Sequence, residues 1–494
     1  MTTEKHASVL IIGCGPAGLG AIEQFKRRGF NVVAYEARDG VGGLWNFDPN
    51  PSPCYVSFDK DGHPVALTDL ERSDQPAPSL TPMYGGVTAN TPKDVMPYRS
   101  HPYPPGTQDS PKYDVIYQYQ KQHAAAYTDY IRFNRVVTRL RHTPPDHALK
   151  NKWLVEWTPP VNSGSSDVGK IFEEGFDHVV VANGSDTRPF IPYTENLWLW
   201  KGDILHSRWY REAKAFAGKT VLVVGAGPSS ADIVRELGML NVEKSPLAPR
   251  KVYRALRSGK TRYDTELEKG WADYIKNIAP IQTVESPSSN SANGRIITTS
   301  GETLDDVDVI IFATGFLFRF EFCRPSDTPF DKAPLLRYTS VPPEYPRPPS
   351  ELVGKAELDG GHRVHNLDAH QLFYLPDPTL AFLLLHAEAI PWPFSEMQAR
   401  VVAAHWSGTK LDLAPHPEEE SDSHSVLVLG HPGEQATPPT SDHCTESRLI
   451  CPFRFEYAEK LLALIGEGGP EEVAADGRWG AWSPEKKHIR ELID

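Results

Sequence analysis

The chain has 494 residues, 39% hydrophobic and 23% charged, a composition typical of a globular protein with two domains or one domain nested in another. Acidic residues outnumber basic ones by 64 to 51, and the net charge of −13 argues against a broad phosphate-binding face, so we expect no nucleic-acid partner. The 45 prolines predict long ordered loops.

The five cysteines show neither a C-x-x-C pair nor the Cys and His spacing of a zinc site, which is typical of free thiols in a reducing compartment. The amino terminus lacks the flanks of a signal peptide, and no apolar run approaches the roughly 18 residues that cross a bilayer. We expect a cytoplasmic protein with no membrane span and no metal, for which a homodimer is a candidate assembly. The cysteines are Cys14, Cys54, Cys323, Cys444 and Cys451.

The first predicted unit covers residues 8–36, where a strand, a glycine turn, a helix and a second strand form a βαβ unit. Glycines let the backbone approach a pyrophosphate, and the helix N-terminus supplies N–H donors. Glu36 ends the second strand, at the spacing of a carboxylate that accepts from ribose hydroxyls. A tight turn without a ligand is the alternative. The candidate nucleotide contacts are Gly13, Gly15, Pro16, Ala17, Gly18 and Glu36.

The middle of the chain carries weaker patterns. Residues 48–82 are rich in Pro, Ser and Asp without a sustained period, which predicts irregular surface chain. Residues 112–140 predict a helix followed by a strand, and the sequences WLVEWT and HVVVANG predict two further strands.

A second βαβ unit opens at residue 219, and its turn contains Gly225, Gly227, Ser229 and Ser230. The next strand, KVYRAL, offers no acid but gives Arg254 and is followed by Arg257. A guanidinium there suits a 2′-phosphate, which indicates NADP rather than NAD, although strand-end arginines can also be merely solvated. Residues 286–294 predict a hairpin tip, VDVIIFATGF returns to a buried strand, and residues 415–439 read as an exposed insertion.

An acid-ended unit followed by a base-ended unit suggests a flavin nucleotide and NADPH, a pair that moves a hydride from nicotinamide to flavin. We therefore predict an α/β fold with two Rossmann-like dinucleotide-binding domains, the NADPH domain inserted into the FAD domain. The expected limits are 1–190 for the first part of the FAD domain, 191–311 for the NADPH domain and 312–494 for the second part of the FAD domain.

The stretch between the two units resembles the fingerprint F-x-G-x-x-x-H-x-x-x-Y/F of the flavin-containing monooxygenases, among the class B flavoprotein monooxygenases. Gly202, His206 and Tyr210 match it, and Trp200 replaces the first phenylalanine. The related Baeyer–Villiger enzymes usually have Trp at the last position, so Tyr210 favours the heteroatom-oxidising branch.

The resemblance extends along most of the chain, through EARDGVGGLW, TANTPKDVMPY, VVVANGSDTRPFIP, IFATGF and PFSEMQAR. His101 stands where the family often has an acid, beside the expected flavin entrance, and residues 415–439 have no counterpart. The resemblance also implies further cofactor contacts at Arg38, Gly42, Gly43, Leu44, Trp45, Asn90, Thr91, Val137 and His206.

In this family, reduced flavin and O₂ give a C4a-hydroperoxyflavin, whose terminal oxygen is attacked by an amine nitrogen or a sulfide sulfur. Asn90 matches the family asparagine that hydrogen-bonds this adduct, because an amide donates and accepts without delivering a proton. Capping the turn before Pro92 is the alternative role. For His206 we favour a hinge or domain-coupling role over a general base, and a plain core histidine is a third reading.

Three other functions remain alternatives or are excluded. Baeyer–Villiger oxygenation of a ketone and a flavoprotein that binds its cofactors without oxygenating, such as an NADPH oxidase, stay open. A disulfide reductase of the C-x-x-C type is excluded by the cysteine spacing. The expected partners are O₂ and a small-molecule substrate whose identity the sequence does not specify; residues 48–82, 338–359 and 415–439 are candidate specificity segments.

Overall fold

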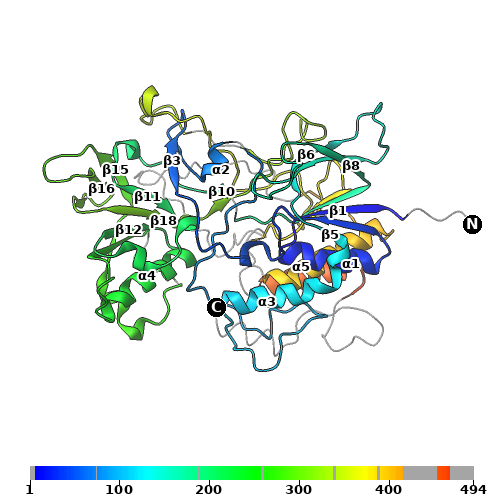
Figure 1. The fold of residues 1–494 in the computed structure, drawn as a ribbon, viewed down its shortest axis with the longest axis horizontal. Helices are drawn as coiled ribbons and strands as arrows, with labels where there is room; N and C mark the ends of the chain where they lie inside the picture. Colours follow the sequence, from blue (N-terminus) through cyan, green and yellow to red (C-terminus); the bar gives the residue numbers. More distant parts are fainter. Residues whose placement is uncertain are drawn as a thin grey trace, which may run out of the picture.

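Two parallel five-stranded sheets organise the computed structural model (Figure 1). The structure describes residues 6–73, 75–186, 188–257, 261, 263–337, 341–386, 390–415 and 453–467. The first sheet has the order β20-β9-β1-β2-β5, and every neighbouring pair is parallel. Its strands are β1 (Ser8–Ile12), β2 (Asn31–Tyr35), β5 (Ile131–Arg132), β9 (His178–Val181) and β20 (Leu380–Phe382).

The second sheet has the order β11-β18-β12-β13-β14 and is also parallel throughout. All of its strands lie in the sequence between β9 and β20, so this sheet is an insertion into the unit built on the first. The predicted fold class is confirmed, and the predicted residue limits of the domains stay predictions. The strands are β11 (Asp203–His206), β12 (Thr220–Val224), β13 (Lys251–Ala255), β14 (Ile275–Ile278) and β18 (Val309–Phe312).

Helices cover the two sheets at opposite ends of the molecule (Figure 1). Helices α1 (Pro16–Arg27), α3 (Tyr113–Ala124) and α5 (Pro391–Trp406) lie with the first sheet, and α4 (Pro228–Val242) lies with the second. The other helices are α2 (Asp69–Arg72) and α6 (Phe453–Ala463), and the 3₁₀ segments are η1 (Gly43–Trp45), η2 (Ala125–Tyr130), η3 (Leu197–Leu199), η4 (Ser207–Trp209), η5 (Ala213–Phe216), η6 (Leu267–Lys269), η7 (Trp271–Tyr274) and η8 (Ser350–Leu352).

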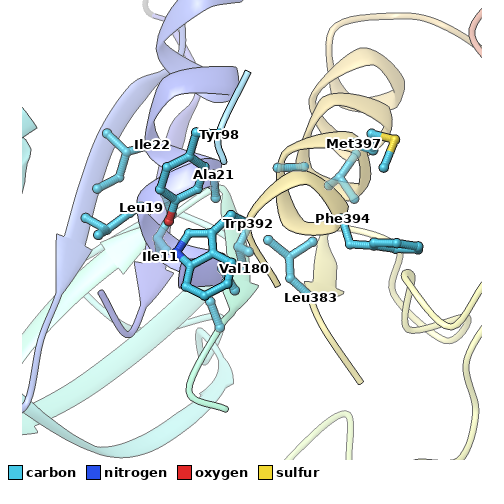
Figure 2. Packing of buried hydrophobic residues seen from close by; sticks show 14 of the residues in the cluster. Ile11, Leu19, Ala21, Ile22, Tyr98, Val180, Leu383, Trp392, Phe394 and Met397 are labelled. Carbon is cyan, nitrogen blue, oxygen red and sulfur yellow. The ribbon is translucent and has the colours of Figure 1, made fainter. Parts of the chain in front are cut away.

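Helix α1 packs tightly against α5. A Cβ added at Gly20 would lie 2.9 Å from the Ser395 hydroxyl, so this close approach requires glycine. Apolar side chains of both helices and of the sheet form one buried cluster, which fixes the helix that follows the first glycine turn. Figure 2 shows this packing, with Ile11, Leu19, Ala21, Ile22, Tyr98, Val180, Leu383, Trp392, Phe394 and Met397 labelled.

Two short strands connect the parts of the chain that carry the two sheets. Strand β10 (Arg188–Pro189) precedes the inserted sheet, β19 (Phe316–Leu317) follows it, and the two pair antiparallel. Both crossings therefore lie side by side, which makes them the natural place for a change in domain orientation.

Antiparallel strands complete the fold. Strands β6 (Val136–His142), β7 (Trp153–Thr158) and β8 (Phe172–Phe176) form one sheet. Strands β15 (Ile281–Glu285), β16 (Arg295–Thr298) and β17 (Thr303–Leu304) form another. Because β15 and β16 pair antiparallel, the hairpin tip predicted at 286–294 is confirmed.

The prediction of irregular surface chain for residues 48–82 is wrong. This segment forms a hairpin of β3 (Tyr55–Phe58) and β4 (Pro64–Leu67), and then α2, whose N-cap Thr68 forms a capping box with Glu71. Phe58 and Ala66 are buried in the same apolar cluster as side chains of the second sheet. The strands have only four residues each, too few to establish a period among the prolines.

Candidate functional site

One cavity of about 1600 Å³ reaches both glycine turns. Its wall includes residues of the first turn, of η1, of the segment around Asn90 and of the start of α4. The carboxyl ends of parallel strands are where open α/β sheets bind ligands, and both sheets present those ends here. Of the predicted site residues, the cavity is lined by Gly13, Gly15, Pro16, Ala17, Glu36, Arg38, Gly43, Leu44, Trp45, Asn90, Thr91, Val137, Ser229 and Arg257.

The first turn is shaped by close backbone contacts. Gly13 has a φ of +102°, and a Cβ there would lie 2.5 Å from the carbonyl oxygen of Ala182, at the end of β9. A Cβ at Gly18 would lie 1.8 Å from the carbonyl oxygen of Gly13. Side chains at either position are thus excluded, and the N-terminus of α1 opens directly into the cavity, where its N–H groups can hold a pyrophosphate.

Glu36 is buried at the end of β2 and faces both the turn and the cavity. One carboxylate oxygen accepts from the backbone N–H of Cys14 at 2.8 Å, and the other accepts from that of Arg38 at 2.9 Å. Burial raises the pKa of this carboxyl, and the two N–H donors oppose that shift. A carboxylate has about four acceptor positions, so lone pairs remain for ribose hydroxyls.

The second turn leaves more room than the first. Gly225 has a φ of +138°, and a Cβ there would lie 2.2 Å from the carbonyl oxygen of Ala313. A Cβ at Gly227 would meet no described atom within 4 Å, so its backbone faces open space where a phosphate fits. Ser230 is buried and donates to the carbonyl oxygen of Gly225 at 2.6 Å, which closes the turn in place of a third glycine.

The structure separates the two arginines predicted to bind the 2′-phosphate. Arg257 lines the cavity. Arg254 is 1% exposed, pairs with Asp264 at 2.7 Å and donates from Nε to Ser230 Oγ at 3.0 Å. Arg254 is therefore engaged beneath the turn, which leaves Arg257 as the better placed candidate.

His206 ends β11 and is fully buried outside the cavity wall. Its Nε2 donates to the carbonyl oxygen of Gly315 at 2.9 Å, and its Nδ1 accepts from the backbone N–H of Arg208 at 3.1 Å. These partners fix the tautomer, since a carbonyl only accepts and an N–H only donates. Burial lowers the pKa of His206 to about 3. The neutral ring thus connects β11 to Gly315, directly before β19, and neither nitrogen is available as a base.

Two arginines next to the matched fingerprint positions, Arg208 within the stretch and Arg211 directly after it, reach residues 48–81. Arg208 donates to the Leu80 carbonyl oxygen at 3.1 Å and pairs with Glu71 at 2.9 Å. Arg211 donates to the carbonyl oxygens of Asp48, at 2.7 Å, and Thr81, at 2.9 Å. The fingerprint therefore holds the chain that leads to Asn90, a connection across more than a hundred residues that no local pattern signals.

Sequence reasoning missed several cavity-lining residues. Tyr84, Asp232 and Arg235 lie in the wall near the second turn. Phe316, in β19, and Phe318, directly after it, also line the cavity. Asp232 had a signal, because it comes one turn after the N-terminus of α4. Tyr84 had none, because its partner is 148 residues away.

The expected place of His101 beside the flavin entrance needs correction. Its ring packs at 5.1 Å from Tyr119 and 5.4 Å from His123, and it does not line the cavity. His101 belongs to an aromatic group between α1 and α3. The exchange of the family's acid for histidine at this position therefore does not change a residue of the cavity wall. Burial lowers the pKa of His101, so the ring favours its neutral form.

Two family models match parts of the chain. The family model "Flavin-binding monooxygenase-like" matches residues 70–286, and the model "NAD(P)-binding Rossmann-like domain" matches residues 11–66. No helix in the described parts of the chain has the length and apolar character of a membrane span.

Two sequence relatives and one solved structure illustrate the likeness. Senecionine N-oxygenase of Tyria jacobaeae is 27% identical over 64% of this chain, a match that spans only 59% of that relative. "Flavin-containing monooxygenase FMO GS-OX-like 8" of Arabidopsis thaliana is 26% identical over 94% of this chain and 86% of its own length. S-allyl-L-cysteine S-oxygenase from Allium sativum shares the fold, with a TM-score of 0.66 at 19% identity over 99% of this chain and 92% of that one.

The two glycine turns, the cavity that joins them and these family matches lead to one assignment. The matches support a flavin-containing monooxygenase family for this chain, and with it an FAD-dependent monooxygenase that uses FAD and NADPH as cofactors.

Proposed function

We propose that the protein transfers one oxygen atom from O₂ to a soft nucleophile, either an amine nitrogen or a sulfide sulfur, with NADPH as the reductant. In the balanced reaction, NADPH, a proton, O₂ and the substrate give NADP⁺, water and the oxygenated substrate. The heteroatom lone pair forms the new bond to oxygen, the O–O bond breaks, and the second oxygen leaves as water. When bound, the reduced flavin supplies the activation of O₂.

The observation that carries this proposal is the single cavity shared by both nucleotide turns and Asn90. A hydride can pass between two cofactors only where both reach one space. The turn at Gly13 would hold FAD, the turn at Gly225 would hold NADPH, and Arg257 would meet its 2′-phosphate. Asn90 would orient the reacting oxygen, because its amide donates and accepts without releasing a proton.

The cavity wall near the second crossing combines the apolar side chains of Phe316, Phe318, Phe322, Leu383 and Leu385 with the charged Arg319 and Glu321. The apolar side chains would limit the access of water on their side of the cavity, which protects an oxygenated cofactor from loss of hydrogen peroxide. It also favours a neutral thioether or the uncharged form of an amine over an ion, since a bare charge is costly to desolvate. Relatives named as an N-oxygenase and an S-oxygenase are consistent with both substrate classes.

The test is a side-by-side assay of a thioether, a tertiary amine and a cyclic ketone with NADPH and isotope-labelled O₂. Catalase removes free hydrogen peroxide, so that sulfide oxidation in solution does not count. We expect labelled sulfoxide or N-oxide. A labelled ester or lactone as the main product would replace the proposal with Baeyer–Villiger chemistry. In a parallel reaction without catalase, NADPH consumption that yields hydrogen peroxide, with no product from any of the three, would indicate an NADPH oxidase.

A further inference from the structure

Tyr84 connects the segment that bears Asn90 to helix α4. Its side chain is buried, and its hydroxyl makes a short hydrogen bond to Asp232, on the first turns of the helix that follows Gly227. The other Asp232 oxygen accepts from Arg235 at 2.8 Å, and Arg235 also pairs with Glu266 at 2.9 Å. All four side chains line the cavity, so a bound nicotinamide nucleotide would lie beside this chain of contacts.

Tyr210, the last fingerprint residue, repeats the arrangement one turn further along α4. Its hydroxyl donates to Glu236 at 2.5 Å, and its ring meets the Tyr84 ring edge to face at 5.5 Å. A Cβ at Gly86 would lie 1.9 Å from a Glu236 carboxylate oxygen, so the backbone after Tyr84 lies directly on this carboxylate. We name Tyr84, Tyr210, Asp232 and Glu236 the tyrosine latch.

The latch gives hydrogen-bond donors to two neighbouring carboxylates. Asp232 and Glu236 are four residues apart on one helix face, where like charges destabilise each other. Burial and the neighbouring carboxylates raise the pKa of both phenols, which therefore stay protonated and able to donate. Each phenol thus gives one carboxylate a donor, and breaking either bond leaves a carboxylate with poorer solvation.

The chain from Tyr84 to Asn90 is held well enough to transmit a displacement. Val87 donates its N–H to the Tyr84 carbonyl oxygen at 3.3 Å, and Ala89 donates to that of Pro111 at 2.9 Å. Gly85 donates to the Arg211 carbonyl oxygen at 3.2 Å, which ties the same stretch to the fingerprint. A shift of α4 would therefore move Asn90 rather than a slack loop.

We propose that Tyr84 is a positioning residue, whose bond to Asp232 couples the seating of the nicotinamide nucleotide on α4 to the placement of Asn90. This inference rests on the proposed function, in which the Gly225 turn holds NADPH and Asn90 serves the oxygenation. Because such coupling is reciprocal, NADP⁺ binding should order residues 84–90, and loss of the latch should weaken that effect.

The test compares Tyr84→Phe with Tyr274→Phe, a matched control on the NADPH side whose ring is 47% exposed. Three quantities are measured on the FAD-loaded enzyme: amide hydrogen exchange of residues 84–90 with and without NADP⁺, anaerobic flavin reduction by NADPH, and hydrogen peroxide formed per NADPH. Exchange reports on the segment without requiring turnover.

In the wild type and in Tyr274→Phe, we expect NADP⁺ to slow exchange at residues 84–90. In Tyr84→Phe this protection should be lost, and exchange in the nucleotide complex should rise by about tenfold, because the lost bond went to a charged acceptor. Peroxide per NADPH should rise in Tyr84→Phe while flavin reduction stays close to that of the control. A merely structural role would instead raise exchange across the whole domain and slow reduction in proportion.

Wild-type protection and wild-type peroxide yield in Tyr84→Phe would overturn the inference, as would an absence of NADP⁺ protection in the wild type. Should Tyr84→Phe not fold, Asp232→Asn tests the same bond from the other side, and protection unchanged in that variant would also overturn it. If the wild type oxygenates no substrate, the proposed function fails while the exchange result still decides whether the latch exists.

Discussion

His206→Ala is the change that best separates a connecting role from a catalytic one. The ring is fully buried, and its removal breaks the hydrogen bonds to Gly315 and Arg208. Each bond contributes about 1 kcal/mol, and the empty space left by the ring adds about 2 kcal/mol, so we expect a loss near 4 kcal/mol in unfolding free energy. The Gly315 carbonyl would keep its hydrogen bond from the Phe190 N–H, but the chain at β19 would lose its bond to the fingerprint histidine.

The matched control is His206→Gln, whose amide N–H can still donate to Gly315. We expect His206→Ala to slow anaerobic reduction of the flavin by NADPH, or to raise peroxide release, and His206→Gln to restore part of the loss. Oxygenation lost in His206→Ala with reduction and peroxide yield unchanged would refute the connecting role. It would restore His206 as a group acting on the reaction itself.

A comparison of the wild type with His206→Gln tests the charge state of His206. Its pKa is about 3 in the folded chain and near 6.5 when unfolded, so the unfolded state binds the extra proton between these values. Stability is therefore fully present above pH 6.5 and falls as the pH drops, by about 2 kcal/mol between pH 7 and pH 5. His206→Gln should show a fall smaller by this amount, because His123 and His178 contribute equally to the pH dependence of both proteins. Equal pH slopes in thermal unfolding would contradict the assignment.

Three further predictions concern cofactor contacts. Arg257→Ala should raise the KM for NADPH far more than that for NADH in flavin reduction, and equal effects would remove the 2′-phosphate role. Asn90→Ala should reduce flavin normally but release more hydrogen peroxide per NADPH, and an unchanged yield would leave Asn90 as a turn residue. Glu36→Gln should purify with less bound FAD, seen in its visible absorbance, because one amide face would oppose an N–H of Cys14 or Arg38. Full FAD occupancy would contradict this reasoning.

The parts of the fold that the sequence predicts are those fixed by short-range patterns. Strand, glycine turn and helix occur together at Gly13 and at Gly225, where positive φ angles of +102° and +138° make glycine a local requirement of the backbone. Arg254 was predicted to contact the 2′-phosphate, although its position in the strand already gave reason to expect a buried side chain. It shares a face of β13 with Val252, and a charge on a buried face requires a partner such as Asp264. Counting alternate residues would have placed it inside rather than at the ligand.

Residues 48–82 show a limit of a different kind. Their order comes from contacts with chain more than a hundred residues away, such as Arg208 with Glu71 and Arg211 with Asp48. Short strands and a one-turn helix have little stability of their own, so tertiary contacts must supply it. No periodicity within the segment could reveal these partners, although the Asp-Gly pair at its hairpin turn, Asp61-Gly62, was a usable signal.

The fingerprint itself illustrates how a motif can serve catalysis without touching the reacting atoms. His206 contacts the crossing strand, Arg208 and Arg211 contact the chain before Asn90, and Tyr210 contacts α4. Three parts of the chain therefore meet at one short stretch. In the proposed reaction a base at this position would be of little use, because a neutral heteroatom needs no deprotonation to attack oxygen. A rigid junction would serve the proposed reaction, because nicotinamide and Asn90 would each have to be placed within a fraction of an ångström for transfer without leakage.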